Sequence, residues 1–175
     1  MHSWRVLLLP FIEQKALYER YDMDEPWDGP SNGRLIRELI YVYRCPSEQH
    51  NGPEFTNYVL VTGPGTPWAD GRAPRYDDFT DGLDCTILVV EVADSNIAWS
   101  EPRDLTFQQA LHGINATRTY GISAWHPLRG AHEKQELVNV AMVDSTIKQL
   151  KNDFSIDTLR KLLQHQDGEP AVPIR

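Results

Sequence analysis

The run "CTILVVEV", from Cys85 to Val92, constrains the fold of this chain more than any other segment. It is continuous, mostly apolar and rich in β-branched residues, which is typical of a strand that is buried on both faces. We expect this strand to be central in a sheet. With 175 residues, the chain is long enough to bury such a sheet in one domain.

Other segments supply the rest of the predicted sheet. Residues 57–63, "NYVLVTG", have the composition of a second strand. Residues 136–150 alternate apolar and polar positions on both sides of Asp144 and Ser145, which predicts a hairpin that turns at this pair. We also expect two further strands, at 41–45 ("YVYRC") and 119–125 ("TYGISAW").

The opening segment "WRVLLLPFI" raises the question of a signal peptide or a membrane anchor. Pro10 interrupts the apolar run, and no small-residue cleavage site follows it. No window reaches the roughly 18 apolar residues that a spanning helix needs. We therefore predict no membrane span, a buried extended lead-in from Trp4 to Leu9, and a short amphipathic helix over residues 10–21.

Three more short helices are expected from their N-cap residues. Ser31 precedes an apolar stripe that runs to residue 40, and Thr106 has Gln109 at the spacing of a capping box. Ser155 precedes a third helix, whose leucines we expect to face the core. Short helices and strands that alternate irregularly predict an α+β fold, with an antiparallel or mixed sheet packed by short helices. We expect one domain over residues 1–167 and a flexible tail over 168–175.

Charge and missing motifs exclude several classes of function. The formal net charge is -8, from 25 acidic and 17 basic residues, and no strong basic cluster offsets it, so we expect no nucleic-acid partner. The sequence has no phosphate-binding glycine loop, no dinucleotide fingerprint, no zinc-protease motif and no nucleophile elbow. We therefore expect no cofactor and assign no catalytic residue.

The long loop from Gly63 to Gly82 is a candidate ligand site. Loops of this length are usually functional or mobile. It carries Trp68 and an acidic set of the kind that binds calcium, although the spacing does not match an EF-hand. The alternative is a solvated turn. The candidate ligand-binding residues are Trp68, Asp77, Asp78, Asp81 and Asp84.

Two other sets of residues leave alternatives open. His126, His132 and Glu133 have side chains that bind zinc, but no paired ligand motif accompanies them, which favours the alternative of a polar loop between two strands. Cys45 and Cys85 form either a disulfide or two buried free thiols, because sequence spacing does not place their β-carbons.

Several motifs together, in order, resemble the bacterial family known as domain of unknown function 1559, which is sometimes grouped with solute-binding-like proteins. They are "SWRVLLLPFIEQKALYERYD", "EPWDGPSN", "YRCPSE", "TNYVLVTGPGT", "FTDGLDCTILVVEVADSNIAWSEPRDL" and "GIN". The resemblance spans roughly residues 3–150, which is most of the chain.

The resemblance implies a pilin-like protein of the bacterial cell envelope, and it carries over no catalytic activity. Members usually begin with a prepilin-type segment and a long hydrophobic helix that packs on an antiparallel sheet. This chain has no such segment, so we expect either a head domain without its helix or an unusual short member of the family. The expected partners are copies of the chain itself or filament and envelope proteins. Cys45 matches the family's Cys-Pro-Ser position, and Ser145 replaces the glycine of its hairpin turn.

The remaining polar candidates are expected to be structural. Glu91 ends the apolar strand, and the segment "EPRDL" places Glu101, Arg103 and Asp104 beside strand-end turns, where they can bind loop backbone. A hydrolase that uses Glu91 or His126 is the weakest hypothesis. The leading hypothesis is an assembly or surface-interaction module, and the alternative is a small-ligand or ion-binding domain that uses the 63–84 loop.

Overall fold

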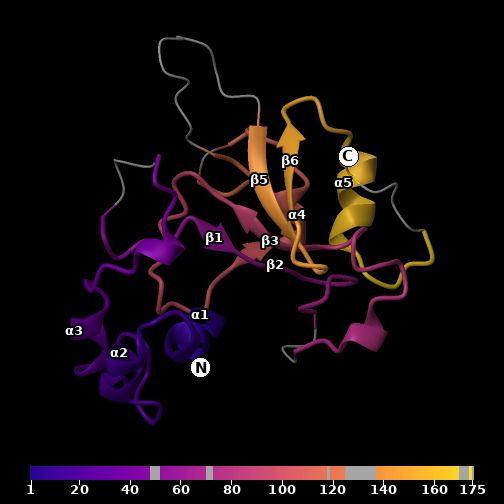
Figure 1. Cartoon of the computed structure of the whole chain (residues 1–175). Coiled ribbons are helices and arrows are strands. Elements are labelled where there is room, and N and C mark those ends of the chain that lie inside the picture. The colour runs from indigo at the N-terminus through magenta and orange to yellow at the C-terminus, as the bar shows by residue number, and fades with distance from the viewer. Residues whose placement is uncertain (48–51, 70–72, 118, 125–136, 170–173, 175) are drawn as a thin grey trace. The chain divides into compact units, whose positions relative to one another are not determined.

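The computed structural model describes residues 1–47, 52–69, 73–117, 119–124, 137–169 and 174 (Figure 1). The chain falls into two compact units. Unit 1 comprises Met1–Asn57 and Ser95–Arg103, and unit 2 comprises Tyr58–Asp94 and Asp104–Arg175. The single domain over residues 1–167 stays a prediction. Most of the predicted flexible tail lies outside the described residues, but Gly168 is described and its N–H donates to Asp81 Oδ1 at 3.2 Å.

Unit 1 is built from short helices and loops. Its elements are α1 (Trp4–Leu8), η1 (Leu9–Phe11), α2 (Lys15–Arg20), α3 (Asn32–Leu35) and η2 (Tyr41–Tyr43). They enclose one apolar core, to which the 95–103 segment contributes Trp99. The core consists of Val6, Leu9, Leu17, Tyr21, Leu35, Ile40, Tyr43 and Trp99.

The extended lead-in predicted for Trp4 to Leu9 is wrong, because this segment is helical. The hydroxyl of Ser3 accepts a hydrogen bond from the N–H of Arg5 at 3.2 Å and caps α1. Leucine also favours helix, so the apolar run forms a helix as readily as a strand. The single helix predicted over 10–21 is interrupted at Glu13, whose φ of 62° separates η1 from α2.

Two more expectations in unit 1 are corrected. The helix predicted from Ser31 to residue 40 is shorter in the structure, because α3 ends at Leu35. The Ser31 hydroxyl does not cap this helix. The Glu25 carboxylate instead accepts the N–H groups of Ser31 at 2.9 Å and Asn32 at 2.8 Å. The strand predicted at 41–45 is the 3-10 turn η2, because the Tyr43 hydroxyl reaches inward and donates to the carbonyl of Arg5 at 2.6 Å.

Unit 2 contains a four-stranded antiparallel sheet, which confirms the α+β fold with an antiparallel sheet. The strand order is β1 (Tyr58–Val59), β3 (Ile87–Glu91), β5 (Leu137–Met142) and β6 (Ile147–Lys151). The apolar strand β3 lies between β1 and β5, so its predicted central position is confirmed. A separate parallel pair joins β2 (Val61–Thr62) to β4 (Leu105–Thr106).

The hairpin of β5 and β6 turns where the sequence predicts. Its inward side chains, Val138, Val140 and Met142, are buried. Ser145 occupies the turn with a φ of 69°, in the left-handed region that favours glycine. Asp144 Oδ1 accepts the hydroxyl of Thr146 at 2.7 Å and the N–H of Thr146 at 2.9 Å, and these two bonds lower the pKa of the Asp144 carboxyl.

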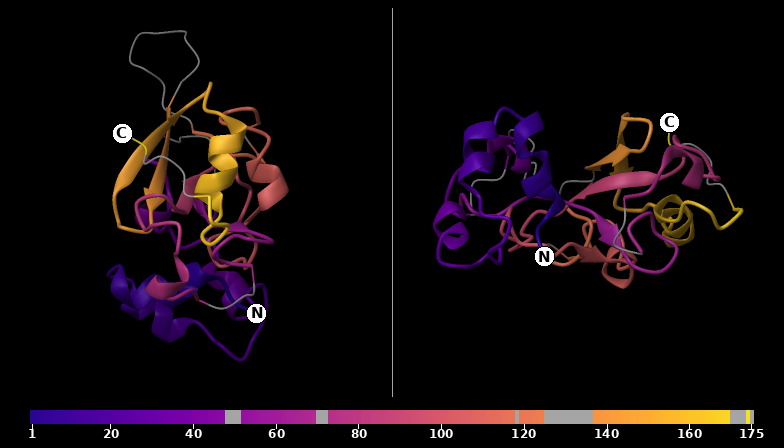
Figure 2. Two further views of the ribbon diagram at one scale, coloured as in Figure 1. Left: turned by 90° about the vertical axis from the view of Figure 1, so that its right-hand side faces the viewer. Right: turned by 90° about the horizontal axis from the view of Figure 1, so that it is seen from below.

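The two capped helices of unit 2 are confirmed. Thr106 and Gln109 form the capping box of α4 (Phe107–Ala110). Ser155 caps α5 (Ile156–Leu163), and the buried leucine face of α5 packs next to the sheet, in contact with β3 (Figures 1 and 2). No strand forms within residues 119–124, although the N–H of Ser123 donates to the carbonyl of Glu91 at 2.9 Å.

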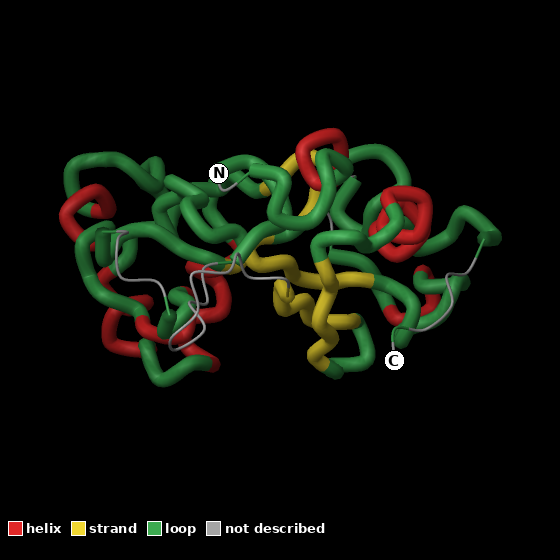
Figure 3. The backbone as a smooth tube through the Cα atoms, turned by 90° about the horizontal axis from the view of Figure 1, so that it is seen from above, coloured by secondary structure: helices red, strands yellow, loops and turns green. Residues whose placement is uncertain are grey.

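Loops make up much of both units, as Figure 3 shows. The 63–82 loop of unit 2 contains only one short element within its described part, η3 (Tyr76–Asp78). No helix in the described ranges is both long enough and apolar enough to cross a membrane.

Candidate functional site

The first candidate site is an apolar surface on the N-terminal helical segment of unit 1. Leu7, Leu8 and Phe11 are 52%, 39% and 81% exposed. Together with the half-buried Trp4 they follow the i, i+3, i+4, i+7 spacing of one helix face, while the opposite face buries Val6 and other residues. We call Trp4, Leu7, Leu8 and Phe11 the N-terminal apolar face. A helix that is apolar on its outer side as well is unusual in a surface position.

A buried arginine holds this helix in place. Arg5 has no exposed surface, and its Nε donates to the carbonyl of Trp99 at 3.2 Å. Its Nη2 donates to the carbonyls of Glu101 at 3.2 Å and Arg103 at 2.9 Å. These bonds compensate for the burial of the charge and attach α1 to the 95–103 segment. The side chain of Arg103 in turn forms a 2.5 Å ion pair with Glu101.

The turn η2 adjoins α1 and adds apolar surface beside it. The rings of Trp4 and Tyr43 meet edge to face with centroids 6.4 Å apart. In the same turn, Tyr41 and Val42 are 79% and 55% exposed. Unit 1 therefore exposes apolar side chains on η2 as well as on the N-terminal apolar face.

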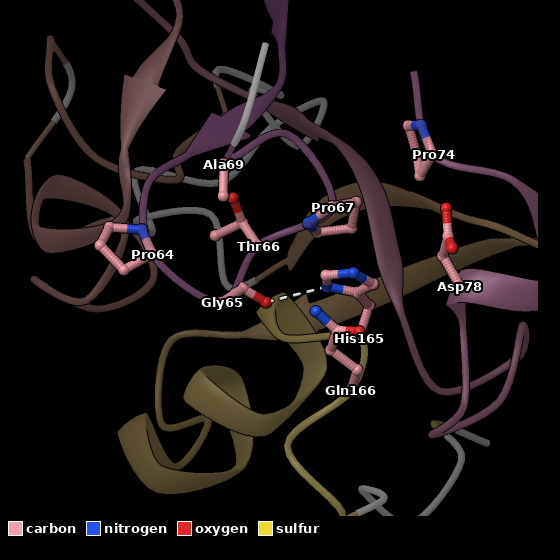
Figure 4. A pocket seen from close by; sticks show the side chains of 9 residues that line it. All are labelled: Pro64, Gly65, Thr66, Pro67, Ala69, Pro74, Asp78, His165 and Gln166. Carbon is pink, nitrogen blue, oxygen red and sulfur yellow. Dashed lines mark hydrogen bonds between the residues drawn. The ribbon is translucent and has the colours of Figure 1, made fainter. Parts of the chain in front are cut away.

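The second candidate site is a hollow of about 220 Å³ in unit 2, at the start of the 63–82 loop and the end of α5 (Figure 4). Gly65, which has a φ of 81°, contributes its carbonyl here, and a β-carbon at this position would lie only 2.7 Å from Gln164 Nε2. The lining consists of Pro64, Gly65, Thr66, Pro67, Ala69, Pro74, Asp78, His165 and Gln166.

His165 is the central polar group of this pocket. It is only 7% exposed, and its Nδ1 lies 3.0 Å from the carbonyl oxygen of Gly65. Because a carbonyl oxygen only accepts, Nδ1 carries a proton, and in the neutral tautomer this leaves Nε2 as the acceptor. Phe79 packs edge-on against the ring, with centroids 5.7 Å apart. The imidazole is thus fixed in one orientation.

The acids of the predicted ligand loop are not brought together. Asp78 lines the pocket, and its Oδ2 accepts the N–H of Arg75 at 2.8 Å. Asp81 is buried and accepts the N–H groups of Asp167 and Gly168, which attaches the chain after α5 to the loop. Asp77 and Asp84 are exposed.

Trp68 lies in sequence between the lining residues Pro67 and Ala69 but is not itself part of the lining. Its indole N–H is buried, and it has no hydrogen-bond partner among the described residues. In the described part of the chain, no group of three or more His, Cys, Asp or Glu side chains is placed to hold a metal ion. His126, His132 and Glu133 lie outside the described residues.

The predicted structural residues of unit 2 bind backbone and amide groups. Glu91 is 1% exposed, and its Oε2 lies 3.4 Å from both the N–H and the side-chain Nδ2 of Asn139. Asp104 Oδ1 accepts the N–H of Leu60 at 3.0 Å. These contacts connect neighbouring segments of unit 2.

The two cysteines are buried free thiols in the structure and belong to different units. The structure therefore contains the free thiols rather than the disulfide. Burial raises the pKa of the Cys85 thiol, and the nearby carboxylates of Asp84 and Asp81 raise it further.

Sequence reasoning missed Arg5 and His165. Arg5 is the one charged residue in the apolar run "WRVLLLPFI". A single charge within an apolar run was the sequence feature that could have pointed to a buried, hydrogen-bonded arginine. His165 has no local motif, because its partner Gly65 is 100 residues away in sequence.

Comparison with known proteins identifies the family. The family described as "Protein of unknown function (DUF1559)" matches residues 1–135. The chain belongs to this family. No curated protein matches the chain. No solved structure matches it either.

The region that matches DUF1559 includes the whole of unit 1 and therefore the N-terminal apolar face. It includes only the loop side of the pocket, since His165 and Gln166 lie beyond residue 135. The pocket of this DUF1559 protein thus combines residues inside and outside the matched region.

Proposed function

We propose that this DUF1559 protein is a non-catalytic, pilin-like assembly module of the cell envelope that associates with a second copy of itself through the N-terminal apolar face. The observation that carries the proposal is the exposure of Leu7, Leu8 and Phe11 on one side of a helical segment. Contiguous exposed apolar residues on a soluble domain mark interaction surfaces.

The pattern of the face supports a helix as its partner. The i, i+3, i+4, i+7 spacing forms the kind of ridge that packs into the groove of another helix. The face contains no charged side chain, so two copies meet there without direct repulsion, although the chain carries a formal net charge of -8. A two-fold contact of this kind uses the same surface on both copies.

The size of the face supports weak association. At roughly 200 Å² for each fully exposed side chain, Leu7, Leu8 and Phe11 together expose roughly 350 Å². A stable interface buries about 800 Å² on each partner. We therefore expect a dimer that forms only at high protein concentration, with Tyr41 and Val42 of η2 contributing at its edge.

The absence of catalysis is part of the proposal. Glu91, the strand-end carboxylate that a hydrolase would use, is 1% exposed and is in contact with Asn139. A carboxylate this deeply buried is not accessible to a substrate. The location in the envelope rests on the resemblance to pilin-like proteins, and cell fractionation tests it: recovery only from the cytoplasmic fraction would contradict it.

Sedimentation velocity over a range of concentrations tests the association. We expect the wild-type chain to shift from monomer towards dimer as its concentration rises, and Phe11→Glu to remain monomeric. Ile147→Glu is the matched control, because Ile147 is 64% exposed on β6 of unit 2 and is not part of the N-terminal apolar face. A wild-type chain that is monomeric throughout, or an equal loss of dimer in both variants, would refute the proposal.

A further inference from the structure

We propose that the pocket of unit 2 binds a small organic cation with a primary ammonium group, such as an alkylamine or a short diamine. The ammonium group would donate to the carboxylate of Asp78 and to Nε2 of His165. Its alkyl part would lie against the proline rings of the lining. This site is separate from the N-terminal apolar face and does not depend on it.

The imidazole gives the first reason. Nε2 of His165 has no hydrogen-bond partner among the described residues, while Nδ1 is held by the Gly65 carbonyl. The ring lines the hollow, with Gly65 and Asp78 on opposite sides of it in Figure 4. A buried acceptor nitrogen without a partner favours a ligand that can donate a hydrogen bond to it.

The remaining polar lining gives the second reason, because it offers acceptors and few donors. The hydroxyl of Thr66 donates to the carbonyl of Gly63 at 2.8 Å, so its free lone pairs are acceptors. Three of the nine described lining residues are prolines, which have no backbone N–H. Within the described lining, the amide of Gln166 is the one neutral side chain that has two N–H donors.

The charge and size of the pocket define the ligand class. Among the described residues of the lining, Asp78 has the only acidic side chain and none is lysine or arginine, so a cation is favoured over an anion. A divalent metal ion is disfavoured, because calcium takes about six to eight oxygen ligands and usually several carboxylates. The volume of about 220 Å³ equals roughly seven waters at about 30 Å³ each, which suits a molecule of amine size.

A binding experiment on the full chain tests the proposal. Putrescine is titrated into the protein and its binding is followed by calorimetry. In separate titrations, 1,4-butanediol, which has the same length but no charge, and calcium chloride serve as comparisons. We expect binding of putrescine at about 10 mM or below and no binding of the diol or of calcium. Equal binding of amine and diol, or no binding of the amine, would overturn the proposal.

A matched pair of variants locates the site. Asp78→Asn keeps the shape of the side chain and an oxygen for the N–H of Arg75, so the fold of η3 is retained. We expect this change to weaken putrescine binding at least tenfold. Asp77→Asn removes the same charge from the neighbouring exposed residue, outside the lining, and we expect it to leave binding within about twofold of wild type. Equal losses in both variants would show a non-specific charge effect and reject the site.

Discussion

Asn32 offers a sharp test of how unit 1 is held together. Its side chain is completely buried, and its Nδ2 donates to the carbonyls of Asp22 at 2.7 Å, Pro26 at 3.1 Å and Glu25 at 3.2 Å. Its Oδ1 accepts the N–H of Asp22 at 2.9 Å. The Asn32 amide thus organises the loop that precedes α3. Asn32→Asp keeps the shape and the accepted bond but points an anionic oxygen at three carbonyl oxygens.

The expected loss of stability follows from those contacts. A buried acceptor left without its donor costs about 1–3 kcal/mol. Two N–H groups are lost, and the carbonyls of the exposed residues Asp22 and Pro26 can regain water. We therefore expect a loss of about 3 kcal/mol. At a urea m-value of about 2 kcal/mol/M, the unfolding midpoint falls by about 1.5 M.

Urea unfolding followed by tryptophan fluorescence measures this effect. Asn96→Asp is the control, since it adds the same charge at an exposed position of unit 1, and its midpoint is expected to stay near that of wild type. An unchanged midpoint for Asn32→Asp would refute the assigned role of the amide. An equal fall in both variants would show that added charge, and not the lost hydrogen bonds, is responsible.

Two further predictions concern the hairpin turn and the thiols. Ser145→Gly is expected to stabilise the chain by about 0.5–1 kcal/mol in urea unfolding, because it relieves the left-handed φ of 69° at a modest entropic cost. Ser145→Ala keeps the β-carbon and should give no gain, so an equal gain from alanine would contradict the reasoning. With a thiol reagent at pH 8, the native chain is expected to leave both buried cysteines unreacted, Cys85 also because burial and the neighbouring carboxylates of Asp84 and Asp81 raise its pKa. When the chain is unfolded without reductant, two thiols should react with the reagent. No reactive thiol in the unfolded chain would indicate a disulfide.

Local signals account for the elements that the sequence predicts correctly. The β-branched residues of β3 and the spacing of Val138, Val140 and Met142 at every second position of β5 both favour a strand over a helix. The helices α4 and α5 follow the N-cap residues Thr106 and Ser155. Each cap side chain accepts a backbone N–H only three residues further along the sequence. These patterns and caps involve only residues that are close together in the sequence, so a short segment is enough to predict them.

The elements that were predicted wrongly depend on distant partners. The apolar run of α1 has the same composition as a buried strand, and its helical form is supported by the bonds from Arg5 to the 95–103 segment. The segment Tyr41–Tyr43 has strand composition, but the Tyr43 hydroxyl is bound to a carbonyl 38 residues away. The pocket likewise depends on the contact of His165 with Gly65, which no local pattern indicates.

Concentration-dependent NMR of the unmodified chain is the most direct test of the proposed assembly through the N-terminal apolar face. Amide spectra of the isotope-labelled protein are compared between dilute and concentrated samples. The account predicts shifts that cluster at residues 4–11, with smaller shifts at 41–43 and none around Ile147 on β6. Spectra that do not change with concentration, or shifts that cluster elsewhere, would contradict it.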